Sequence, residues 1–343
     1  MNILIALIIL AVLILVHEWG HFMAARKIGI PVYEFSLGFG TKLASTKKDG
    51  VEYTLRLIPM GGYVRMAGEE PGDMDNPDGY NHRKPIEKIG LAFGGPFMNF
   101  VLAVVIFIYI FTFIGLAQPV EQAVIGEMVP DKPAATSGLQ SNDRVVSVNG
   151  KMVFTWEEFV NQISSQEVGT PLQVVVDRGG NNVSLTLRSV ADPNSGKPII
   201  GVYPQIKYQR QGIWQAIKLG FIQTYQMTVV LLKGLVMLFN GTASVSDLAG
   251  PIGITSMVGE AARGGIIYLL TFSAFLSINL GIINLLPIPA LDGSRICFAI
   301  VEAIRRKPLE PEKEGLIHWG GFIFLMLLML LATYNDLVRL FKG

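Results

Sequence analysis

Two histidines and a glutamate near the N-terminus have the spacing of a metal-binding, hydrolytic motif. The run His17-Glu18-Trp19-Gly20-His21 separates the two histidines by four residues. On a helix this spacing places both imidazoles on one face, one turn apart, where they can bind the same ion. Zinc held in this way lowers the pKa of a bound water to about 7, and Glu18 would be the general base that takes a proton from that water. The motif therefore predicts zinc-dependent hydrolysis.

A third protein ligand is needed if zinc is to keep one position open for water. The preferred candidate is Asp292, which follows Pro287 and Pro289 in the run 284–293. Prolines interrupt a helix, and irregular backbone at membrane depth is tolerated where it lines a protein or water cavity. Read as structure alone, the run is a kinked helix that ends in a capping aspartate. Glu302 and Asp247 are weaker candidates for this ligand, and we expect His82 and His318 to be loop or interface residues.

The elements that must hold these residues lie in a membrane. Hydrophobic residues make up 50% of the 343-residue chain and charged residues only 16%, and the mean hydropathy is +0.44. This composition is too apolar for an ordinary soluble protein. Four segments have the length and character of a membrane crossing, at about 2–24, 97–117, 266–290 and 319–334. We expect the first to be a retained helix and not a signal peptide, because no Lys or Arg precedes it and no small-residue cleavage site follows.

Charge and cysteine content exclude several other classes of protein. The formal net charge is only +1, and no basic tract interleaved with aromatics occurs, so we expect no nucleic-acid partner. Cys297 is the single cysteine, which rules out an intramolecular disulfide and a metal site built from cysteines.

An ionisable residue deep in a bilayer costs about 2.5 to 3.5 kcal/mol on insertion scales. Three such residues on the first apolar segment therefore indicate function and not a chance match.

The distribution of Lys and Arg predicts the orientation of the chain. These residues gather after the first segment, before the second and after the third, so we expect those loops to be cytoplasmic and both termini to be outside. The stretch 213–239 is long enough to span but is interrupted by Gln and Lys residues, which favours an amphipathic helix lying on the membrane. A fifth crossing there would also place Asp292 at the outer end, away from His17 and His21.

A soluble module lies between the second span and this amphipathic stretch, at about 120–203. Residues 173–178 and 183–187 alternate like strands around the turn Gly179-Gly180-Asn181, and 156–164 is predicted to be a short helix. The run 133–150 resembles the bacterial PDZ pattern of small residues, Gly-Leu, an Asp and a strand ending in Asn-Gly. Such domains bind extended peptide at a sheet edge. The alternative is a small β-rich domain that only packs on the membrane face.

These patterns together predict a multi-pass α-helical membrane protein. We expect four transmembrane helices, a membrane-associated β-hairpin and one inserted extracytoplasmic PDZ domain of the α+β class. The predicted parts are an N-terminal membrane part at 1–117, the PDZ domain at 118–205, the amphipathic region at 206–260 and a C-terminal membrane part at 261–343.

The combination of motifs resembles the site-2 proteases, and more closely the bacterial group that includes the regulator-of-sigma-E protease. The likeness covers nearly the whole chain and rests on residues 17–21, Leu291-Asp292-Gly293, the Gly-Pro runs at 95–100 and 250–254, and the inserted PDZ region. It departs in one respect, since residues 120–203 have room for one PDZ domain and not the tandem pair of the sigma-E-type enzyme. This departure leaves the pathway and the substrate open.

The resemblance implies an intramembrane endopeptidase with one zinc ion per chain, in a bacterial cytoplasmic membrane. Its substrates would be single-span membrane proteins, such as anti-sigma factors, or remnant signal peptides, commonly after another protease has trimmed the outer part. Membrane lipids would surround it. The PDZ domain would act as a size filter or as a docking site for a trimmed terminus, and the residues do not choose between these.

A helical substrate has its amides occupied by internal hydrogen bonds, so it must be unwound before water can attack. The segment 52–66 combines β-favouring residues with a Gly61-Gly62 turn, and its family counterpart is a membrane-dipping β-hairpin that pairs with substrate. We expect Gly61, Gly62 and Tyr63 to bind the substrate strand and Asn284 to hydrogen-bond it. Pro287 and Pro289 would hold the helix open around it. The alternative is a cytoplasmic hairpin that only covers the site.

Two rival functions come from other classes. A catalytically silent membrane scaffold would use its PDZ domain for binding and its zinc for structure, but structural zinc usually has four protein ligands and only three good ones are found. A transporter would explain buried ionisable residues and a broken helix, but the second half of the chain does not repeat the first.

Overall fold

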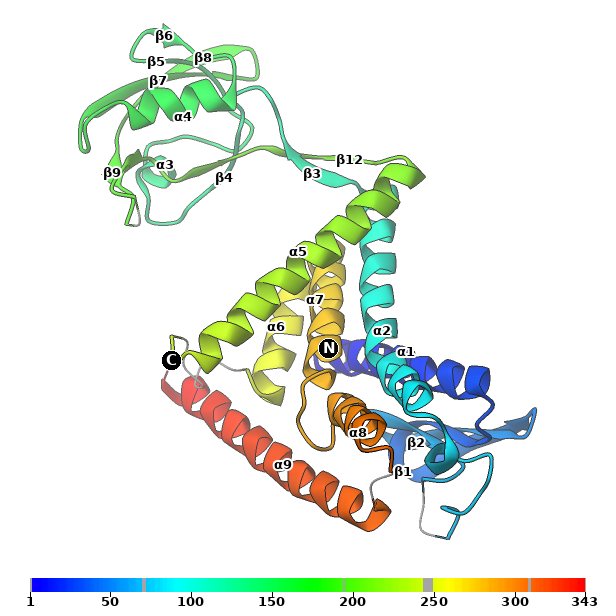
Figure 1. The fold of residues 1–343 in the computed structure, drawn as a ribbon. Coiled ribbons are helices and arrows are strands. Elements are labelled where there is room, and N and C mark those ends of the chain that lie inside the picture. Colours follow the sequence, from blue (N-terminus) through cyan, green and yellow to red (C-terminus); the bar gives the residue numbers. More distant parts are fainter. Residues whose placement is uncertain (1, 70–71, 194, 243–248, 308–309, 343) are drawn as a thin grey trace. The chain divides into compact units, whose positions relative to one another are not determined.

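The computed structural model describes residues 2–69, 72–193, 195–242, 249–307 and 310–342. The chain divides into two compact units, one formed by residues 1–112 with 212–343 and the other by residues 113–211. Helices dominate the first unit, which also contains the β1–β2 sheet, whereas the second unit consists mostly of strands (Figure 1).

Five helices of the first unit, counted over the described residues, are long and apolar enough to cross a bilayer. They are α1 (Asn2–Ile28), α2 (Pro85–Tyr109), α5 (Ile213–Phe239), α7 (Ile266–Asn284) and α9 (Pro311–Lys342). All four predicted spans fall at least partly on α1, α2, α7 and α9. The fifth, α5, packs against α2 and α7 and meets the same length and composition criteria. Its surface location, and with it the count of four crossings, stays a prediction.

Helix α2 begins at Pro85, well before the expected start at Phe97. Pro96, in the Gly-Pro run at 95–100 just before the expected span, lies inside the helix and not ahead of it. The Lys and Arg residues before the expected span also predicted a loop there, and this prediction is wrong for the start of α2. Lys88 is buried near the start of α2, where its ammonium pairs with Glu302 at 2.8 Å, so a charged segment can be helical and enclosed. At the other end, α2 passes into η2 (Ile110–Ile114), and Leu116–Pro119 form strand β3.

Helices α1 and α2 cross at a pair of glycines. A Cβ at Gly20 would overlap the carbonyl oxygen of Gly94, and a Cβ at Gly94 would lie 2.7 Å from the carbonyl oxygen of Gly20. Only hydrogen fits at both positions, so the two backbones approach directly. This crossing places the His17–His21 face of α1 against α2.

Strands β1 (Val32–Lys48) and β2 (Val51–Met66) are both bent, and this gives one sheet with four segments. The first half of β1 lies between two segments of β2, since Glu34 is in register with Glu52 on one side and with Arg65 on the other. Gly61 and Gly62 lie where β2 passes from one side of β1 to the other, so the predicted hairpin turn is a bend within a long strand. Phe35 and Phe22 pack in the cluster that joins the sheet to α1.

The third predicted span ends earlier than expected. Helix α7 stops at Asn284, and a new helix, α8 (Asp292–Arg305), starts at Asp292. The segment between them is therefore a turn and not a kinked helix. Pro287 and Pro289 have no N–H to donate, and Ala290 takes a positive φ of 76°, which a helix cannot contain. A further helix, α6 (Pro251–Arg263), was not predicted and lies between α5 and α7 in the sequence.

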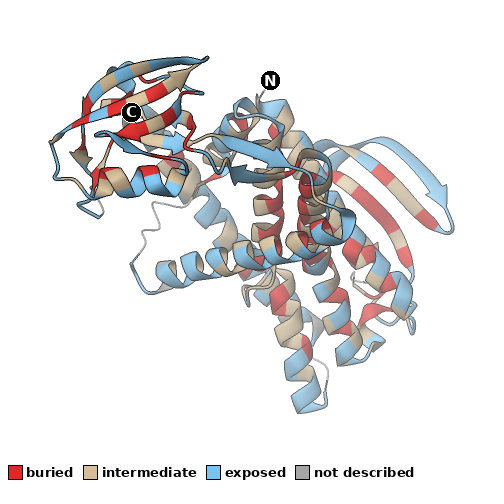
Figure 2. Cartoon of the chain, turned by 90° about the horizontal axis from the view of Figure 1, so that it is seen from above, coloured by how far each residue is buried: buried red, intermediate tan, exposed pale blue. Residues whose placement is uncertain are grey.

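The second unit contains a four-stranded sheet in the order β6-β5-β7-β8. The predicted hairpin is confirmed as β7 (Pro171–Arg178) and β8 (Asn181–Arg188), and the predicted helix as α4 (Trp156–Ser164). Buried residues alternate with less buried ones along most of β7, and bands of buried and exposed residues are visible on the strands of this unit in Figure 2. The remaining elements are β4 (Ile125–Met128), α3 (Pro133–Thr136), β5 (Arg144–Val148), β6 (Lys151–Met152), β9 (Val190–Ala191), β10 (Pro198–Ile199), β11 (Val202–Pro204) and β12 (Ile206–Gln209).

Candidate metal centre and active-site cavity

Three side chains converge at the point where α1 meets the start of α8. The Nε2 atoms of His17 and His21 are 3.2 Å apart, and Oδ2 of Asp292 lies 3.2 Å from the first and 3.3 Å from the second. A tetrahedral zinc ion with ligands at about 2.0 to 2.1 Å requires ligand atoms about 3.3 to 3.4 Å apart. The three atoms thus have the spacing of one face of a zinc tetrahedron. Within the described part of the chain, they form the one group of three or more His, Cys, Asp or Glu side chains close enough to hold a metal.

The surroundings of these atoms also fit a metal ion. Oδ2 of Asp292 is buried and accepts no hydrogen bond, although buried carboxylate oxygens are normally satisfied. Nδ1 of His21 lies 2.9 Å from the carbonyl oxygen of Leu91. Because a carbonyl oxygen can only accept a hydrogen bond, Nδ1 carries the proton. This contact fixes the His21 tautomer that leaves Nε2 free to bind a metal. A nitrogen and oxygen donor set of this kind suits zinc.

Glu18 follows His17 on α1 and faces the same cavity as His17 and His21. It is half-buried. Its side chain runs along strand β2, since a Cβ at Gly62 would lie 3.0 Å from Cγ of Glu18. A larger residue at position 62 would push this carboxylate aside.

A cavity of about 710 Å³ opens onto the three converging side chains. Its wall combines residues from α1, β2, the end of α7, the start of α8 and the first turns of α9. The predicted site residues on this wall are His17, Glu18, His21, Gly61, Gly62, Tyr63, Asn284 and Asp292.

Pro287 and Pro289 are not part of the cavity wall. They lie in the turn between α7 and α8, where Pro289 is in close contact with Gly321 of α9. Their place in this turn fits the expected role of keeping the helix open, by ending α7 ahead of Asp292. They offer no surface to a molecule in the cavity.

One wall of the cavity is the last segment of β2. Residues 62–65 are in register with β1 along their inner side, from Leu37 opposite Gly62 to Glu34 opposite Arg65. No strand among the described residues pairs with their outer side. Gly61, Gly62, Tyr63 and Val64 border the cavity. An extended peptide could therefore add to this edge beside the metal-binding side chains.

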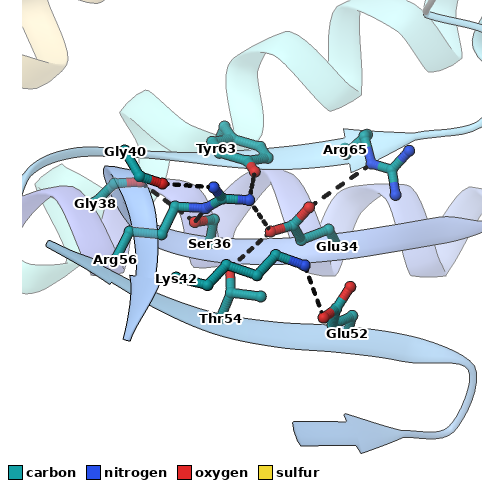
Figure 3. Close-up of polar contacts among 10 residues, drawn as sticks. All are labelled: Glu34, Ser36, Gly38, Gly40, Lys42, Glu52, Thr54, Arg56, Tyr63 and Arg65. Atoms are coloured by element: carbon teal, nitrogen blue, oxygen red, sulfur yellow. Dashed lines mark hydrogen bonds and ion pairs between the residues drawn. The ribbon is translucent and has the colours of Figure 1, made fainter. Parts of the chain in front are cut away.

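A polar network on the far face of the sheet holds this edge segment (Figure 3). The Arg56 guanidinium reaches across the first half of β1. Its Nη2 donates to Oε1 of Glu34 and to the hydroxyl of Tyr63, both at 2.7 Å. Thr54 donates to the same Glu34 oxygen at 2.7 Å. Burial alone would raise the pKa of Glu34, but hydrogen bonds from Arg56, Thr54 and Tyr63 hold this pKa below its ordinary value. The network joins three segments of the sheet through one buried carboxylate.

Three more residues at the cavity escaped prediction. Arg295 lies one turn after Asp292, and its Nη1 donates to Oε1 of Glu69 at 2.7 Å. The i, i+3 spacing from Asp292 is a sequence signal that could have found Arg295. His318, expected to be a loop or interface residue, lines the cavity from α9, and its Nδ1 accepts the backbone N–H of Ala290 at 3.0 Å. Nothing local in the sequence connects residues so far apart.

The weaker ligand candidates lie elsewhere. Glu302 pairs with Lys88, and His82 lies in η1 (Tyr80–His82) away from the group of three. Asp247 falls outside the described residues.

Comparison with known proteins assigns the family. Residues 5–328 match the sequence profile of peptidase family M50. The chain is 35% identical to the zinc metalloprotease RasP of Geobacillus kaustophilus, in an alignment that covers 98% of this chain and 97% of the relative. It is 33% identical to the regulator of sigma-W protease RasP of Bacillus subtilis, with 98% of each covered. The chain belongs to peptidase family M50, the site-2 proteases. It is a zinc metalloprotease of the membrane, in agreement with the resemblance and the enzyme class predicted from the sequence.

The relatives differ in length within the family. The alignment to the Geobacillus protein extends over 417 positions, so that relative has stretches that this 343-residue chain lacks. A zinc metalloprotease of Clostridium acetobutylicum, 33% identical, aligns over 337 residues and covers 98% of this chain. Among solved structures, the PDZ domain of an SdrC-like protein from Listeria monocytogenes is 23% identical and covers 25% of this chain and 90% of its own, with a TM-score of 0.23. The PDZ assignment of the second unit stays a prediction.

Proposed function

We propose that this chain is an intramembrane endopeptidase that cleaves the transmembrane segments of single-span membrane proteins, or remnant signal peptides, in a bacterial cytoplasmic membrane. One observation carries the proposal. The triangle formed by His17, His21 and Asp292 lies in a cavity beside an unpaired strand edge, in a unit built from helices of membrane-spanning length. A metal centre for hydrolysis and a template for an extended peptide are thus next to each other.

In this mechanism His17, His21 and Asp292 would hold one zinc ion. Bound there, zinc would acidify a water molecule and polarise the scissile carbonyl. Glu18 takes a proton from the water as the water oxygen bonds to the carbonyl carbon. The Glu18 carboxyl then gives this proton to the amide nitrogen as the carbon–nitrogen bond breaks, which releases an amine and a carboxylic acid.

The substrate must be an extended strand when it reacts. We propose that it pairs with the outer side of residues 62–66, with contacts from Gly61, Gly62 and Tyr63, and that the Asn284 amide hydrogen-bonds its backbone. Strand addition satisfies the peptide groups that unwinding a transmembrane helix leaves free. The closeness of Gly62 to Glu18 supports this arrangement, because it brings the template next to the proposed base.

The name of one relative supports the proposed substrate class. The Bacillus subtilis relative is named a regulator of sigma-W protease, so single-span anti-sigma factors are the first substrates to test. We propose that a prior-acting protease trims them and that residues 118–205 form an extracytoplasmic PDZ domain. That domain would exclude untrimmed proteins or bind a trimmed terminus, and both chain termini would lie on its side of the membrane.

The test uses purified full-length protein, a model transmembrane peptide and a zinc assay. Glu18→Gln should retain zinc and lose cleavage, whereas Asp292→Ala should lose both. Glu260→Gln, an exposed glutamate on α6, serves as the matched control and should behave as wild type. Cleavage that survives Glu18→Gln would refute the mechanism. Wild-type protein that binds zinc but cleaves no trimmed membrane substrate would instead support a silent scaffold.

A further inference from the structure

The Gly-Pro motif at the α1–α2 crossing contains a polar residue with no role in the mechanism above. Asn99 is fully buried on α2, and its side-chain amide lies beside His17. The Nδ2 atom of Asn99 is 3.1 Å from Nδ1 of His17. The other amide atom, Oδ1, is buried and has no hydrogen-bond partner. A buried acceptor without a partner calls for an explanation.

The orientation of this amide decides which nitrogen of His17 carries the proton. With Nδ2 toward His17, the amide donates to Nδ1, and in a neutral ring the proton must then be on Nε2. A protonated Nε2 cannot bind a metal. The oxygen and nitrogen of an amide have nearly the same shape, so the opposite orientation fits the same space. In that orientation Oδ1 accepts a hydrogen bond from Nδ1–H of His17, and the lone pair of Nε2 faces His21 and Asp292.

The contact that Leu91 makes with His21 on the same face of α2 favours the second orientation. Leu91, Gly95 and Asn99 are spaced four apart, so they lie along one stripe of the helix. The Leu91 carbonyl accepts from Nδ1 of His21, and Gly95 leaves room for both imidazoles. Asn99 occupies the equivalent place for His17. The Leu91 carbonyl and the Asn99 amide thus contact His21 and His17 at Nδ1, on the side away from the proposed metal.

We infer that Asn99 is a positioning residue for the metal centre. Its amide oxygen accepts the Nδ1–H of His17 and fixes the tautomer whose Nε2 can bind zinc. The inference rests on the proposed function, since it needs zinc between His17, His21 and Asp292. The inference gives the buried Asn99 oxygen a hydrogen-bond partner, and it explains why the Gly-Pro run at 95–100 contains a buried polar residue.

Zinc affinity of the full-length protein in detergent, measured by competition with a chelator, tests this role. Asn99→Leu keeps the size of the side chain and removes both hydrogen-bonding groups, so affinity should fall about 10- to 100-fold, as for other groups that orient metal-binding histidines. Asn99→Asp can accept but not donate, and should bind zinc as tightly as wild type or more tightly. The control is Ser277→Ala, which removes a buried donor to the Asn99 backbone carbonyl at 2.7 Å and should leave the affinity unchanged.

Histidine NMR gives a second readout that needs neither metal nor activity. The chain has four histidines, and His17→Asn identifies the His17 signal in protein labelled with ¹⁵N-histidine. Metal-free wild type and Asn99→Asp should both show His17 protonated at Nδ1. This measurement decides the question even if Asn99→Leu does not fold. A wild-type His17 protonated at Nε2, or an Asn99→Asp protein that loses zinc, would overturn the inference, because the amide would then be a donor.

The two levels of the proposal fail in different ways. If His17→Asn leaves zinc affinity unchanged, the proposed metal centre is wrong and the role of Asn99 falls with it. If His17→Asn weakens zinc binding and Asn99→Leu does not, only the inference about Asn99 is wrong.

Discussion

Gly95 of α2 lies directly against the imidazole of His21 on α1, so close that a Cβ at position 95 would overlap Nε2. The same Cβ would lie 2.8 Å from Nε2 of His17. Glycine at this position is therefore a condition for both histidines to point at one place. The proposed metal centre therefore requires the absence of a side chain at position 95 of α2.

The first prediction follows from this contact. Gly95→Ala should displace both imidazoles and lower kcat/KM by on the order of 100-fold, the loss expected when a catalytic group moves by about 1 Å. Zinc affinity should fall with it. Gly90→Ala on the same helix is the control, because a Cβ there meets nothing within 4 Å. An active Gly95→Ala protein with normal zinc binding would mean that the histidines are arranged differently.

The second prediction concerns the Arg56 network. Arg56→Met should leave Glu34 buried without its main partner and free the Tyr63 hydroxyl. Losing one partner of a fully buried pair costs about 3 to 5 kcal/mol, and the partial exposure of Arg56 reduces this to about 2 kcal/mol of unfolding free energy. Because the edge segment loses its anchor, KM for a transmembrane peptide should rise more than kcat falls.

Two comparisons sharpen this test. Arg56→Met combined with Glu34→Leu removes both charges and should restore much of the stability, since no unpaired charge remains. Lys42→Met breaks the Lys42–Glu52 pair, in which Lys42 is largely exposed, and should change stability by less than about 1 kcal/mol without affecting KM. A normal KM in the unstable Arg56→Met protein would show that the network stabilises the sheet without shaping the substrate edge.

Local patterns in the sequence predicted the parts of the site that depend on local geometry. The i, i+4 spacing of His17 and His21 depends only on helical repeat, and the β7–β8 hairpin only on alternation around Gly179 and Gly180. The selection of Asp292 used a proline-broken helix end together with an estimate of membrane depth. The spacing and alternation signals lie within a few residues of the features that they predict, whereas the depth of Asp292 came from the distribution of Lys and Arg along the whole chain.

Features that depend on partners far away in the sequence escaped prediction. The charged residues at the start of α2 predicted a loop. In the structure this segment is helical, and Lys88 pairs with Glu302. The two-sided pairing of β1 is not visible in the strand pattern, because the alternation of residues is the same whichever segment lies beside it. The contact between His318 and Ala290 joins residues on separate helices. In each case tertiary contact, and not local preference, determines the structure.

The third prediction concerns that contact. Ala290 has a positive φ of 76°, and its N–H donates to Nδ1 of His318, two residues before the proposed ligand Asp292. Ala290→Gly should stabilise the protein by about 1 kcal/mol, because relief of left-handed strain worth about 1 to 2 kcal/mol outweighs the added freedom of the unfolded chain, about 0.4 to 1 kcal/mol. His318→Phe should remove this acceptor, cost about 0.5 to 1 kcal/mol because water can reach the exposed Ala290 N–H, and lower zinc affinity. Thermal unfolding and chelator competition measure both effects. Equal zinc affinity in His318→Phe and wild type would separate the turn from the metal centre.

The fourth prediction concerns the last helix and α6. Asp336 of α9 is buried, and its carboxylate accepts the backbone N–H groups of Gly250 at 3.2 Å and Gly253 at 2.8 Å. A carboxylate at a helix N-terminus is stabilised both by these hydrogen bonds and by the helix dipole. A Cβ at Gly250 would lie 2.6 Å from Oδ2 of Asp336, so glycine is needed there for the carboxylate to reach the backbone.

Replacing this carboxylate should therefore weaken the α6–α9 contact in a graded way. Asp336→Asn keeps one acceptor but loses the charge, and should cost about 1 to 2 kcal/mol. Asp336→Ala leaves two N–H groups without partners and should cost about 2 to 4 kcal/mol. Thr333→Val, an exposed change one turn earlier on α9, is the control and should have little effect. The midpoint of thermal unfolding in detergent measures all three. If Asp336→Asn and Asp336→Ala unfold at the wild-type temperature, the carboxylate does not secure α6.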